Sequence, residues 1–228
     1  MRGKSMGTRG SASHGGAGYF GRNFNLSGYY DPAHVNVYDA EQMHLHHGNF
    51  SQELWNSLSD AERAGIRSYT GAWYTDMNDA LFGGGAVSGR VQQMIDNATS
   101  GMNRMASQFN FVAYRGDSPY DMANLLGGTR DQLRNAAFLR GSIGKTVEFK
   151  GFMSTAIHED YAWTHKGVTT VIKTPKGAKG FFVDPVSANQ GEKEFLFQRG
   201  TKMKVVRIET DSSGDLKKIY LEVVPGKK

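Results

Sequence analysis

The chain contains no cysteine, only 5 prolines among its 228 residues, and no long apolar run. Without cysteine it can form no disulfide, so it needs neither an oxidising nor a reducing compartment. A helix that crosses a membrane needs about 20 consecutive apolar residues, and we therefore expect no membrane span. Residues 1–21 also lack the apolar segment of a standard secretory signal peptide, so any export is expected to follow another route.

A concentration of charge of one sign is also missing. The 27 basic and 22 acidic residues give a net charge of +5, and they are spread along the sequence. Proteins that bind nucleic acids typically carry a basic stripe or patch, so a nucleic acid is not an expected partner. A modest positive excess is suited instead to an anionic cofactor or an acidic partner.

The beginning of the chain differs in composition from the rest. Residues 1–30 are rich in glycine and serine, and such a segment has too little apolar surface to form a core. We expect residues 1–30 to be a flexible tail. Residues 31–228 are long enough for one folded domain with a substantial core.

Helical patterns come first within that domain, and strand-like patterns follow. Ser51 is an N-cap candidate, Ser59 and Glu62 form a capping box, and apolar residues recur at helical spacing over 88–105. A further helix is expected near 122–140, with a possible break at 127–128. Short apolar runs then predict strands at 110–116, 146–155, 169–173, 180–183, 195–198, 202–209 and 217–224, with a hairpin turn at 212–215. This order indicates an α+β fold with mostly antiparallel strands.

Three histidines are the candidate metal ligands in the first half of the chain: His44, His46 and His47. Their spacing of i, i+2 and i+3 matches no standard zinc site, and cysteines are missing. We therefore expect a solvated cluster of histidines and no metal.

Three polar features stand where apolar, strand-like runs begin or end: Arg115, the pair Ser154 and Thr155, and the pair Glu192 and Glu194. If a strand opens at this last pair, its two carboxylates project from the same face, because residues two apart share a face of a strand. Their repulsion then has to be relieved by water or used in a reaction. Taken singly, each feature also fits a surface charge, a turn or a solvated strand edge.

The order of these features resembles the signature of the mono-ADP-ribosyltransferase toxins, which is Arg, then Ser-Thr-Ser, then Glu-x-Glu. Segments 69–78, 174–180 and 199–205 are also similar to that family's first helix, its Pro-Lys-Gly turn and the strand after its catalytic glutamate. The resemblance implies an ADP-ribosyltransferase catalytic domain over residues 31–228. In that fold, N-terminal helices pack on two mostly antiparallel sheets, with NAD in a central cleft.

The resemblance also implies roles for individual residues. Glu194 is expected to stabilise the positive charge that develops on ribose as nicotinamide leaves. Ser154 would orient Glu194 by a hydrogen bond, and Thr155 would support the strand and the nicotinamide wall. Arg115, with Gly116 beside it, is expected to bind NAD, since a guanidinium offers a planar fork of donors to phosphate.

Glu192 stands at the position that, in this family, goes with an arginine acceptor on a target protein. A guanidinium is a poor nucleophile, and a carboxylate can attract it and take a proton from it. Trp163 is expected to stack on nicotinamide, and Lys166 to meet a phosphate. Because water can replace the acceptor, NAD glycohydrolase activity is an expected side reaction.

The resemblance further implies a toxin or effector that is exported or delivered into a target cell, with an immunity or delivery protein as a further partner. Three positions depart from the family pattern. Ala156 replaces the third residue of Ser-Thr-Ser, Phe82 replaces an arginine at the end of the first helix, and Asn189 stands where relatives often have an aromatic residue. Two alternatives stay open: an NAD glycohydrolase that depletes NAD, and a catalytically inactive binding or structural module of the same fold.

Overall fold

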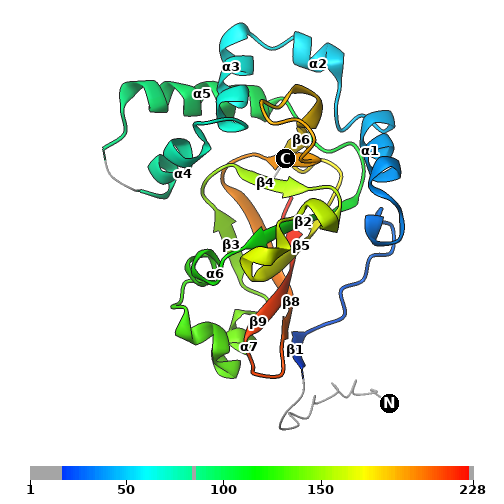
Figure 1. Ribbon diagram of the computed structural model, residues 1–228, viewed down its shortest axis with the longest axis vertical. Coiled ribbons are helices and arrows are strands. Elements are labelled where there is room, and N and C mark those ends of the chain that lie inside the picture. Colours follow the sequence, from blue (N-terminus) through cyan, green and yellow to red (C-terminus); the bar gives the residue numbers. More distant parts are fainter. Residues whose placement is uncertain (1–16, 84–85, 226–228) are drawn as a thin grey trace, which may run out of the picture.

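The computed structural model describes residues 17–83 and 86–225. Its helices, in chain order, are α1 (Val37–His46), α2 (Gln52–Asn56), α3 (Asp60–Tyr69), α4 (Tyr74–Phe82), α5 (Gly89–Asn103), α6 (Pro119–Leu126) and α7 (Ala136–Ser142). Helices α2 to α5 gather at one end of the molecule, whereas α6 and α7 lie toward the other end (Figure 1). The predicted N-caps are confirmed, because Ser51 accepts a hydrogen bond from the first turn of α2 and Ser59 forms a complete capping box with Glu62.

The strands are β1 (Gly18–Gly21), β2 (Phe111–Asp117), β3 (Thr146–Phe149), β4 (Met153–Ala156), β5 (Val168–Thr174), β6 (Gly180–Phe182), β7 (Glu194–Phe197), β8 (Thr201–Thr210) and β9 (Leu216–Val223). They form one nine-stranded sheet in the order β1-β8-β9-β5-β2-β4-β7-β6, and β3 pairs with β8. Only the β5–β9 pair is parallel among the described strands. The α+β class is therefore confirmed.

The two expected sheets are two parts of one sheet. Strands β2 and β4 are joined through a single residue pair, Tyr114 and Ala156, whereas β2 pairs with β5 along its whole length. The sheet is thus nearly divided at this point, with β4, β7 and β6 on one side. The cavity described below lies beside this division.

The strand expected over 146–155 is interrupted. Residues 146–149 pair with β8, and residues 153–156 pair with β7. Between them lies Gly151, where a Cβ atom would come within 2.3 Å of the Asn78 Oδ1 atom. The chain changes its pairing partner at this crowded point, which the apolar pattern of the run did not indicate.

The helix expected near 122–140 is also divided. Helix α6 ends at Gly127, which adopts a left-handed conformation with φ 72°, as glycine does at many helix ends. A short 3-10 turn follows at Asp131–Arg134, and Asn135 then caps the start of α7. The break at 127–128 was predicted, but the second start signal at Asn135 was not.

The segment before residue 31 is partly a strand, so the predicted tail over 1–30 was too long. Strand β1 pairs with β8, which places residues 18–21 at the edge of the sheet. Phe24 and Tyr29 then pack on the sheet, and the Lys173 Nζ atom lies 5.6 Å and 4.6 Å from the centres of their rings. Glycine-rich composition hid these few anchoring aromatic residues. Residues 1–16 lie outside the described residues.

His44 is buried in the core, so the prediction of a solvated histidine cluster was wrong for this residue. Its ring makes edge contacts with Phe109 and Phe111, and Asn49 lies within hydrogen-bond distance of its Nδ1 atom, at 3.0 Å. Burial lowers the pKa of His44 to about 3. His44 is therefore a neutral part of the packing between α1 and the sheet.

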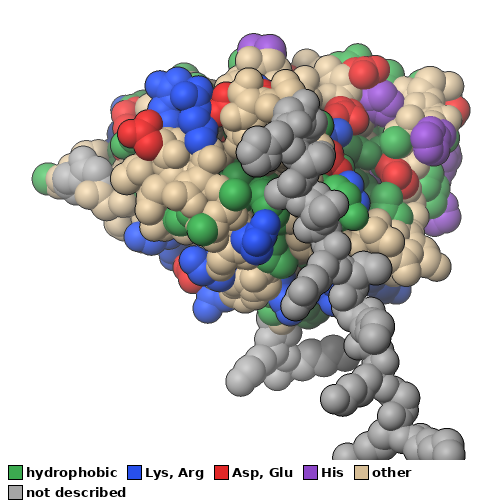
Figure 2. All heavy atoms as spheres, turned by 90° about the horizontal axis from the view of Figure 1, so that it is seen from below, with side chains coloured by type: hydrophobic (Ala, Val, Ile, Leu, Met, Phe, Trp, Pro, Cys, Tyr) green, Lys and Arg blue, Asp and Glu red, His purple; other side chains and the backbone are tan. Residues whose placement is uncertain are grey.

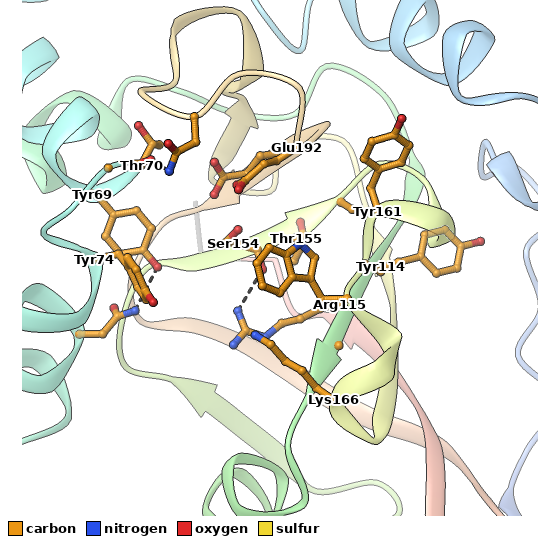
Figure 3. A pocket seen from close by; sticks show the side chains of 18 residues that line it. Tyr69, Thr70, Tyr74, Tyr114, Arg115, Ser154, Thr155, Tyr161, Lys166 and Glu192 are labelled. Carbon is orange, nitrogen blue, oxygen red and sulfur yellow. Dashed lines mark hydrogen bonds between the residues drawn. The ribbon is translucent and has the colours of Figure 1, made fainter.

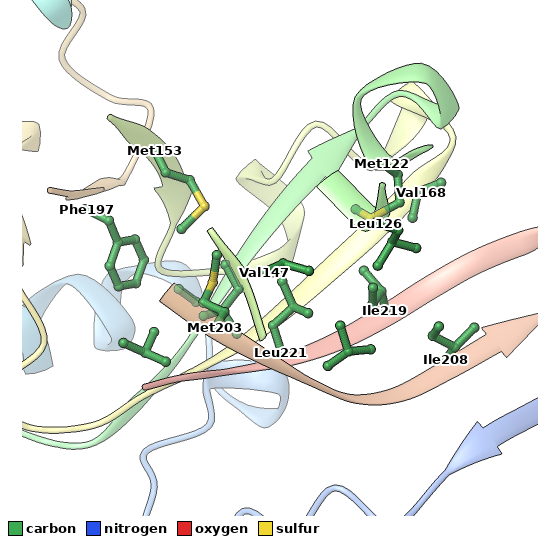
Figure 4. Packing of buried hydrophobic residues seen from close by; sticks show 14 of the residues in the cluster. Met122, Leu126, Val147, Met153, Val168, Phe197, Met203, Ile208, Ile219 and Leu221 are labelled. Atoms are coloured by element: carbon green, nitrogen blue, oxygen red, sulfur yellow. The ribbon is translucent and has the colours of Figure 1, made fainter. Parts of the chain in front are cut away.

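The largest apolar cluster of the described residues packs the sheet against α1, α6 and α7. Figure 4 shows Met122 and Leu126 of α6 against Val168 of β5, while Met203 and Leu221 pack nearby on the same sheet. This burial fixes β2 and β5, on which part of the cavity is built.

The outer surface carries both signs of charge. On the face shown in Figure 2, lysine and arginine side chains lie in several separate groups with acidic side chains among them. None of the helices in residues 17–83 and 86–225 has the length and apolar character needed to span a bilayer.

Candidate active site

A cavity of about 340 Å³ lies between α3, α4 and the centre of the sheet. It is lined by every residue that the sequence singled out as a site residue: Arg115, Gly116, Ser154, Thr155, Trp163, Lys166, Glu192 and Glu194. Figure 3 shows Tyr69 and Tyr74 on its helical side, and Tyr114 and Tyr161 on the opposite side. Residues from four distant stretches of the chain therefore surround one space.

Glu194 is the first residue of β7 and is only 4% exposed. It stands directly opposite Ala156 on β4, so Ser154, two residues earlier on that strand, lies on the same face as a diagonal neighbour. Burial raises the pKa of Glu194 to about 7, a hydrogen bond with Ser154 acts to lower it, and the negative charge of Glu192 raises it further. The pairing thus brings Ser154 within reach of Glu194.

Glu192 does not share a strand with Glu194, so the expected side-by-side arrangement on one strand face was wrong. Lys193 between them adopts a left-handed conformation with φ 54°, and β7 begins only after it. Both glutamates nevertheless line the cavity. Glu192 is half-buried, and burial followed by the charge of Asp184 raises its pKa above the usual range.

Arg115 lies inside β2 rather than at its end. Its Nε atom donates to the Asp117 Oδ1 atom at 2.6 Å. Its Nη1 atom donates to the Ser154 carbonyl at 3.0 Å, a bond drawn in Figure 3. The guanidinium also lies 5.0 Å from the centre of the Phe149 ring. Burial acts to lower the pKa of Arg115, but the adjacent Asp117 carboxylate outweighs it, so the guanidinium stays charged.

Asp117 is a residue that the sequence reasoning missed. It is buried and accepts a hydrogen bond from the Thr170 hydroxyl at 2.7 Å, which fixes it beside Arg115. The signal was present, because Arg115 and Asp117 are two residues apart on a strand and so share a face. The pair orients the guanidinium toward the cavity.

Gly116 allows the segment 158–167 to approach the sheet closely. A Cβ atom at Gly116 would come within 2.0 Å of the Trp163 carbonyl oxygen. Trp163 itself has a left-handed backbone with φ 55°, and the residue is 54% exposed at the cavity rim. The Lys166 Nζ atom lies 5.1 Å from the centre of that ring, so these two predicted residues stand together.

Thr155 lines the cavity while its hydroxyl donates to the Phe195 carbonyl at 2.6 Å. This bond ties β4 to β7 beside Glu194. Ten further lining residues were not predicted as site residues, among them Tyr114, Tyr161 and Asn189. The Tyr114 hydroxyl donates to the Asp31 carboxylate at 2.8 Å, and the Asn189 amide donates to the Thr70 carbonyl at 3.0 Å. Their positions depend on pairings between distant segments, for which the sequence held no signal.

The arrangement combines a fixed guanidinium, two carboxylates of unequal burial and an aromatic rim. The guanidinium can bind phosphate oxygens. A carboxylate beside a hydroxyl can stabilise positive charge that develops in a reaction. The half-buried Glu192, whose pKa is raised by burial and by the charge of Asp184, can attract a cation and accept a proton.

The sequence matches a known protein family along most of its length. The family model described as ADP-ribosyltransferase exoenzyme matches residues 46–227. A protein named Mono-ADP-ribosyltransferase C3, from Clostridium botulinum D phage, is 25% identical over 168 residues, which is 69% of this chain and 66% of that protein. Secreted exoenzyme S of Pseudomonas aeruginosa is 28% identical over 170 residues, which is 75% of this chain and 34% of that protein. The matches thus span less than two thirds of either relative.

Solved structures show the same fold. C3stau2 from S. aureus, determined with NAD, aligns with a TM-score of 0.69 at 17% identity and covers 86% of this chain and 100% of that chain. The ADP-ribosylating toxin BECa of C. perfringens, determined with NADH, aligns with a TM-score of 0.69 at 20% identity, covering 86% of this chain and 50% of that chain. At these identities the likeness establishes the fold.

Proposed function

This chain belongs to the ADP-ribosyltransferase exoenzyme family, and we propose that it transfers ADP-ribose from NAD to an arginine of a target protein and releases nicotinamide. The family is one of bacterial toxins and exoenzymes that use NAD as substrate. The single observation that carries the proposal is the meeting of Arg115, Ser154, Glu192 and Glu194 in one cavity. Arginine as the acceptor is inferred from Glu192.

The cavity fits NAD in its chemistry. Arg115 uses its Nε and Nη1 atoms for protein partners, and a guanidinium carries five N–H donors, so donors remain for a pyrophosphate. Trp163 offers an exposed ring on which nicotinamide could stack, and Lys166 adds a positive charge at the rim. These residues, with Gly116 and Thr155 in the wall, would hold NAD.

Glu194 would stabilise the positive charge on ribose as its bond to nicotinamide breaks. The carboxylate is buried, and electrostatic interactions are stronger away from water than in it. Ser154 would keep the carboxylate oriented. Because Glu194 would contact the reacting ribose, it would be needed both for transfer to a protein and for hydrolysis by water.

Glu192 would act on the acceptor. Its carboxylate lies at the more open side of the pair, where it can attract a guanidinium and accept the proton that is released when the nitrogen bonds to ribose. Water needs no such attraction, so hydrolysis of NAD depends less on Glu192. NAD glycohydrolase activity is thus part of the proposal as a side reaction.

Two isosteric variants test this division of roles. With labelled NAD and a cell lysate, Glu194→Gln should abolish both protein labelling and nicotinamide release. Glu192→Gln should reduce protein labelling by about 10² to 10⁴-fold, the usual contribution of a general base, and leave nicotinamide release nearly intact. Equal losses of both activities in Glu192→Gln would contradict the division. If the parent enzyme releases nicotinamide but labels no protein, it is an NAD glycohydrolase. If it releases no nicotinamide at all, it is an inactive module of this fold.

We also propose that the chain acts as a toxin or effector delivered into a target cell. The relative named Secreted exoenzyme S supports this proposal. Expression of the parent enzyme and of Glu194→Gln inside eukaryotic and bacterial cells provides the test, because only the active enzyme should arrest growth in the target.

A further inference from the structure

The loop between β6 and β7 carries Glu192 and folds around one buried carboxylate. Asp184 is 5% exposed and belongs to the 3-10 turn Asp184–Val186. Its Oδ1 atom accepts hydrogen bonds from the backbone N–H groups of Gly191 at 3.1 Å and Lys193 at 2.9 Å. These two groups flank Glu192, so a single side chain fixes the backbone on both sides of it.

Lys193 links the same loop to α1 and to Asp184. Its Nζ atom donates to the Glu41 Oε2 atom on α1 at 2.9 Å and lies 3.9 Å from the Asp184 Oδ2 atom. The left-handed backbone of Lys193 turns its side chain toward α1, while Glu192 and Glu194 line the cavity. The Lys193 ammonium thus lies near the buried charge of Asp184, and its bond to Glu41 attaches the loop to a helix outside the cavity.

The start of the same loop is attached to the end of α3. The Ala188 N–H group donates to the Thr70 hydroxyl at 3.0 Å, and the Asn189 side chain donates to the Thr70 carbonyl at 3.0 Å. The Arg67 Nε atom donates to the Val186 carbonyl at 3.3 Å. Held at both ends, the loop keeps little freedom around Glu192.

We propose that Asp184 is a positioning residue that directs Glu192 into the cavity, and that the Lys193–Glu41 ion pair holds this geometry against α1. The inference rests on the proposed role of Glu192 in activating the acceptor. Its consequence is that Asp184 governs the ratio of protein transfer to NAD hydrolysis without touching either reactant.

The charge of Asp184 has a second effect on the two glutamates. It raises the pKa of Glu192 after burial, and it adds to the rise of the pKa of Glu194. The other titratable and charged groups around the pair come from α1, α3, α4, β2, the segment 158–167 and the loop itself: Glu41, Tyr69, Tyr74, Arg115, Tyr161, Lys166 and Lys193. Removal of the Asp184 charge should therefore lower the pKa of both glutamates.

Two substitutions separate geometry from charge. Asp184→Asn keeps an oxygen that can accept the two N–H bonds but removes the charge, whereas Asp184→Ala removes both. We expect Asp184→Asn to retain protein labelling within a few-fold and to shift the acid limb of its pH profile to lower pH. Asp184→Ala should lose labelling by about 10²-fold, the usual cost of a misplaced catalytic group, with a much smaller loss of nicotinamide release.

Asp211→Asn is the matched control. Asp211 also accepts two backbone N–H bonds in a turn, from Ser213 at 2.9 Å and Asp215 at 3.0 Å, but it lies in the β8–β9 hairpin. This variant should leave both activities and the pH profile unchanged. Thermal unfolding of all three variants shows whether any loss comes from a general failure to fold.

Two readouts are independent of catalysis. NMR should show faster hydrogen exchange at the N–H groups of Gly191 and Lys193 in Asp184→Ala, and a lower pKa of Glu192 in Asp184→Asn. The inference would be overturned if hydrogen exchange at these N–H groups were unchanged in Asp184→Ala. It would also be overturned if this variant lost nicotinamide release as strongly as protein labelling. An unchanged pKa of Glu192 in Asp184→Asn would contradict the second, electrostatic effect of Asp184. If these NMR changes occur but the parent enzyme labels no arginine, the proposed function fails and the positioning by Asp184 stands.

Discussion

At the residue scale, Glu194 is held where its charged form is costly. It is 4% exposed, and burial dominates the rise of its pKa to about 7, although Ser154 and Arg115 act in the opposite direction. A carboxylate in such a place gains more from a developing positive charge than a solvated one would. The same burial that suits it to catalysis also works against the stability of the protein without substrate.

This conflict predicts a pH dependence of stability. The pKa of Glu194 is raised to about 7 from the ordinary value of about 4.5, so its contribution to the stability of the fold is complete below about pH 4.5 and is lost as the pH rises through about 7. Such a shift corresponds to about 3 kcal/mol. Urea unfolding of the parent protein and Glu194→Gln at several pH values should therefore show the parent losing about that amount relative to the variant between pH 4.5 and pH 8. A constant difference across this range would contradict the assigned cause.

At the element scale, the segment 158–167 depends on contacts with three parts of the chain. The ring of His158 lies within hydrogen-bond distance of the Val35 carbonyl, at 3.0 Å, and the Lys218 ammonium donates to Glu159 at 3.1 Å. The Trp163 carbonyl lies where a side chain at position 116 would stand. The segment that carries Trp163 and Lys166 is thus held by the sheet below it.

Gly116→Ala should therefore displace this segment. The added Cβ atom would lie 2.0 Å from the Trp163 carbonyl oxygen. Neither atom can avoid the other by a side-chain rotation, because the oxygen is part of the backbone and the Cβ atom is bonded to it. We expect weaker NAD binding and a higher KM for NAD, measured by calorimetry and by initial rates. Gly89→Ala is the control, because a Cβ atom there meets nothing within 4 Å, and it should leave NAD binding unchanged.

At the scale of the whole molecule, the segment 18–31 completes the sheet on which the cavity is built. Tyr19 stacks on Arg207, Phe24 packs on Tyr220, and the hydroxyl of Tyr114 on β2 donates to Asp31. These contacts join the N-terminal part of the chain to β2, β8 and β9. The domain therefore begins earlier than residue 31.

Truncation tests this boundary. Deletion of residues 1–30 removes β1 and the aromatic side chains that pack on the sheet, and should reduce the free energy of unfolding by about 3 kcal/mol or more. Deletion of residues 1–16 retains these contacts and serves as the reference. Equal stability of the two truncated proteins, measured by urea unfolding, would contradict the assignment.

The sequence was sufficient for the fold class and for the residues that meet in the cavity, because these depend on local patterns and an ordered set of motifs. It was insufficient where distant segments decide the structure. The change of partner at Gly151, the left-handed Lys193 and the pairing of β1 with β8 all depend on long-range contacts. Asp184 was missed for a related reason, since it acts through partners that only the folded chain identifies, whereas Asp117 could have been found from its spacing of two residues from Arg115.

The most direct test of the proposed function is to identify the modified amino acid. The purified enzyme would be incubated with NAD and a cell lysate, and mass spectrometry would locate ADP-ribose on the labelled proteins, with Glu194→Gln as the control. We predict ADP-ribose on arginine side chains, present with the parent enzyme and absent with Glu194→Gln. ADP-ribose on another type of residue, or NAD consumption without any modified protein, would contradict arginine transfer.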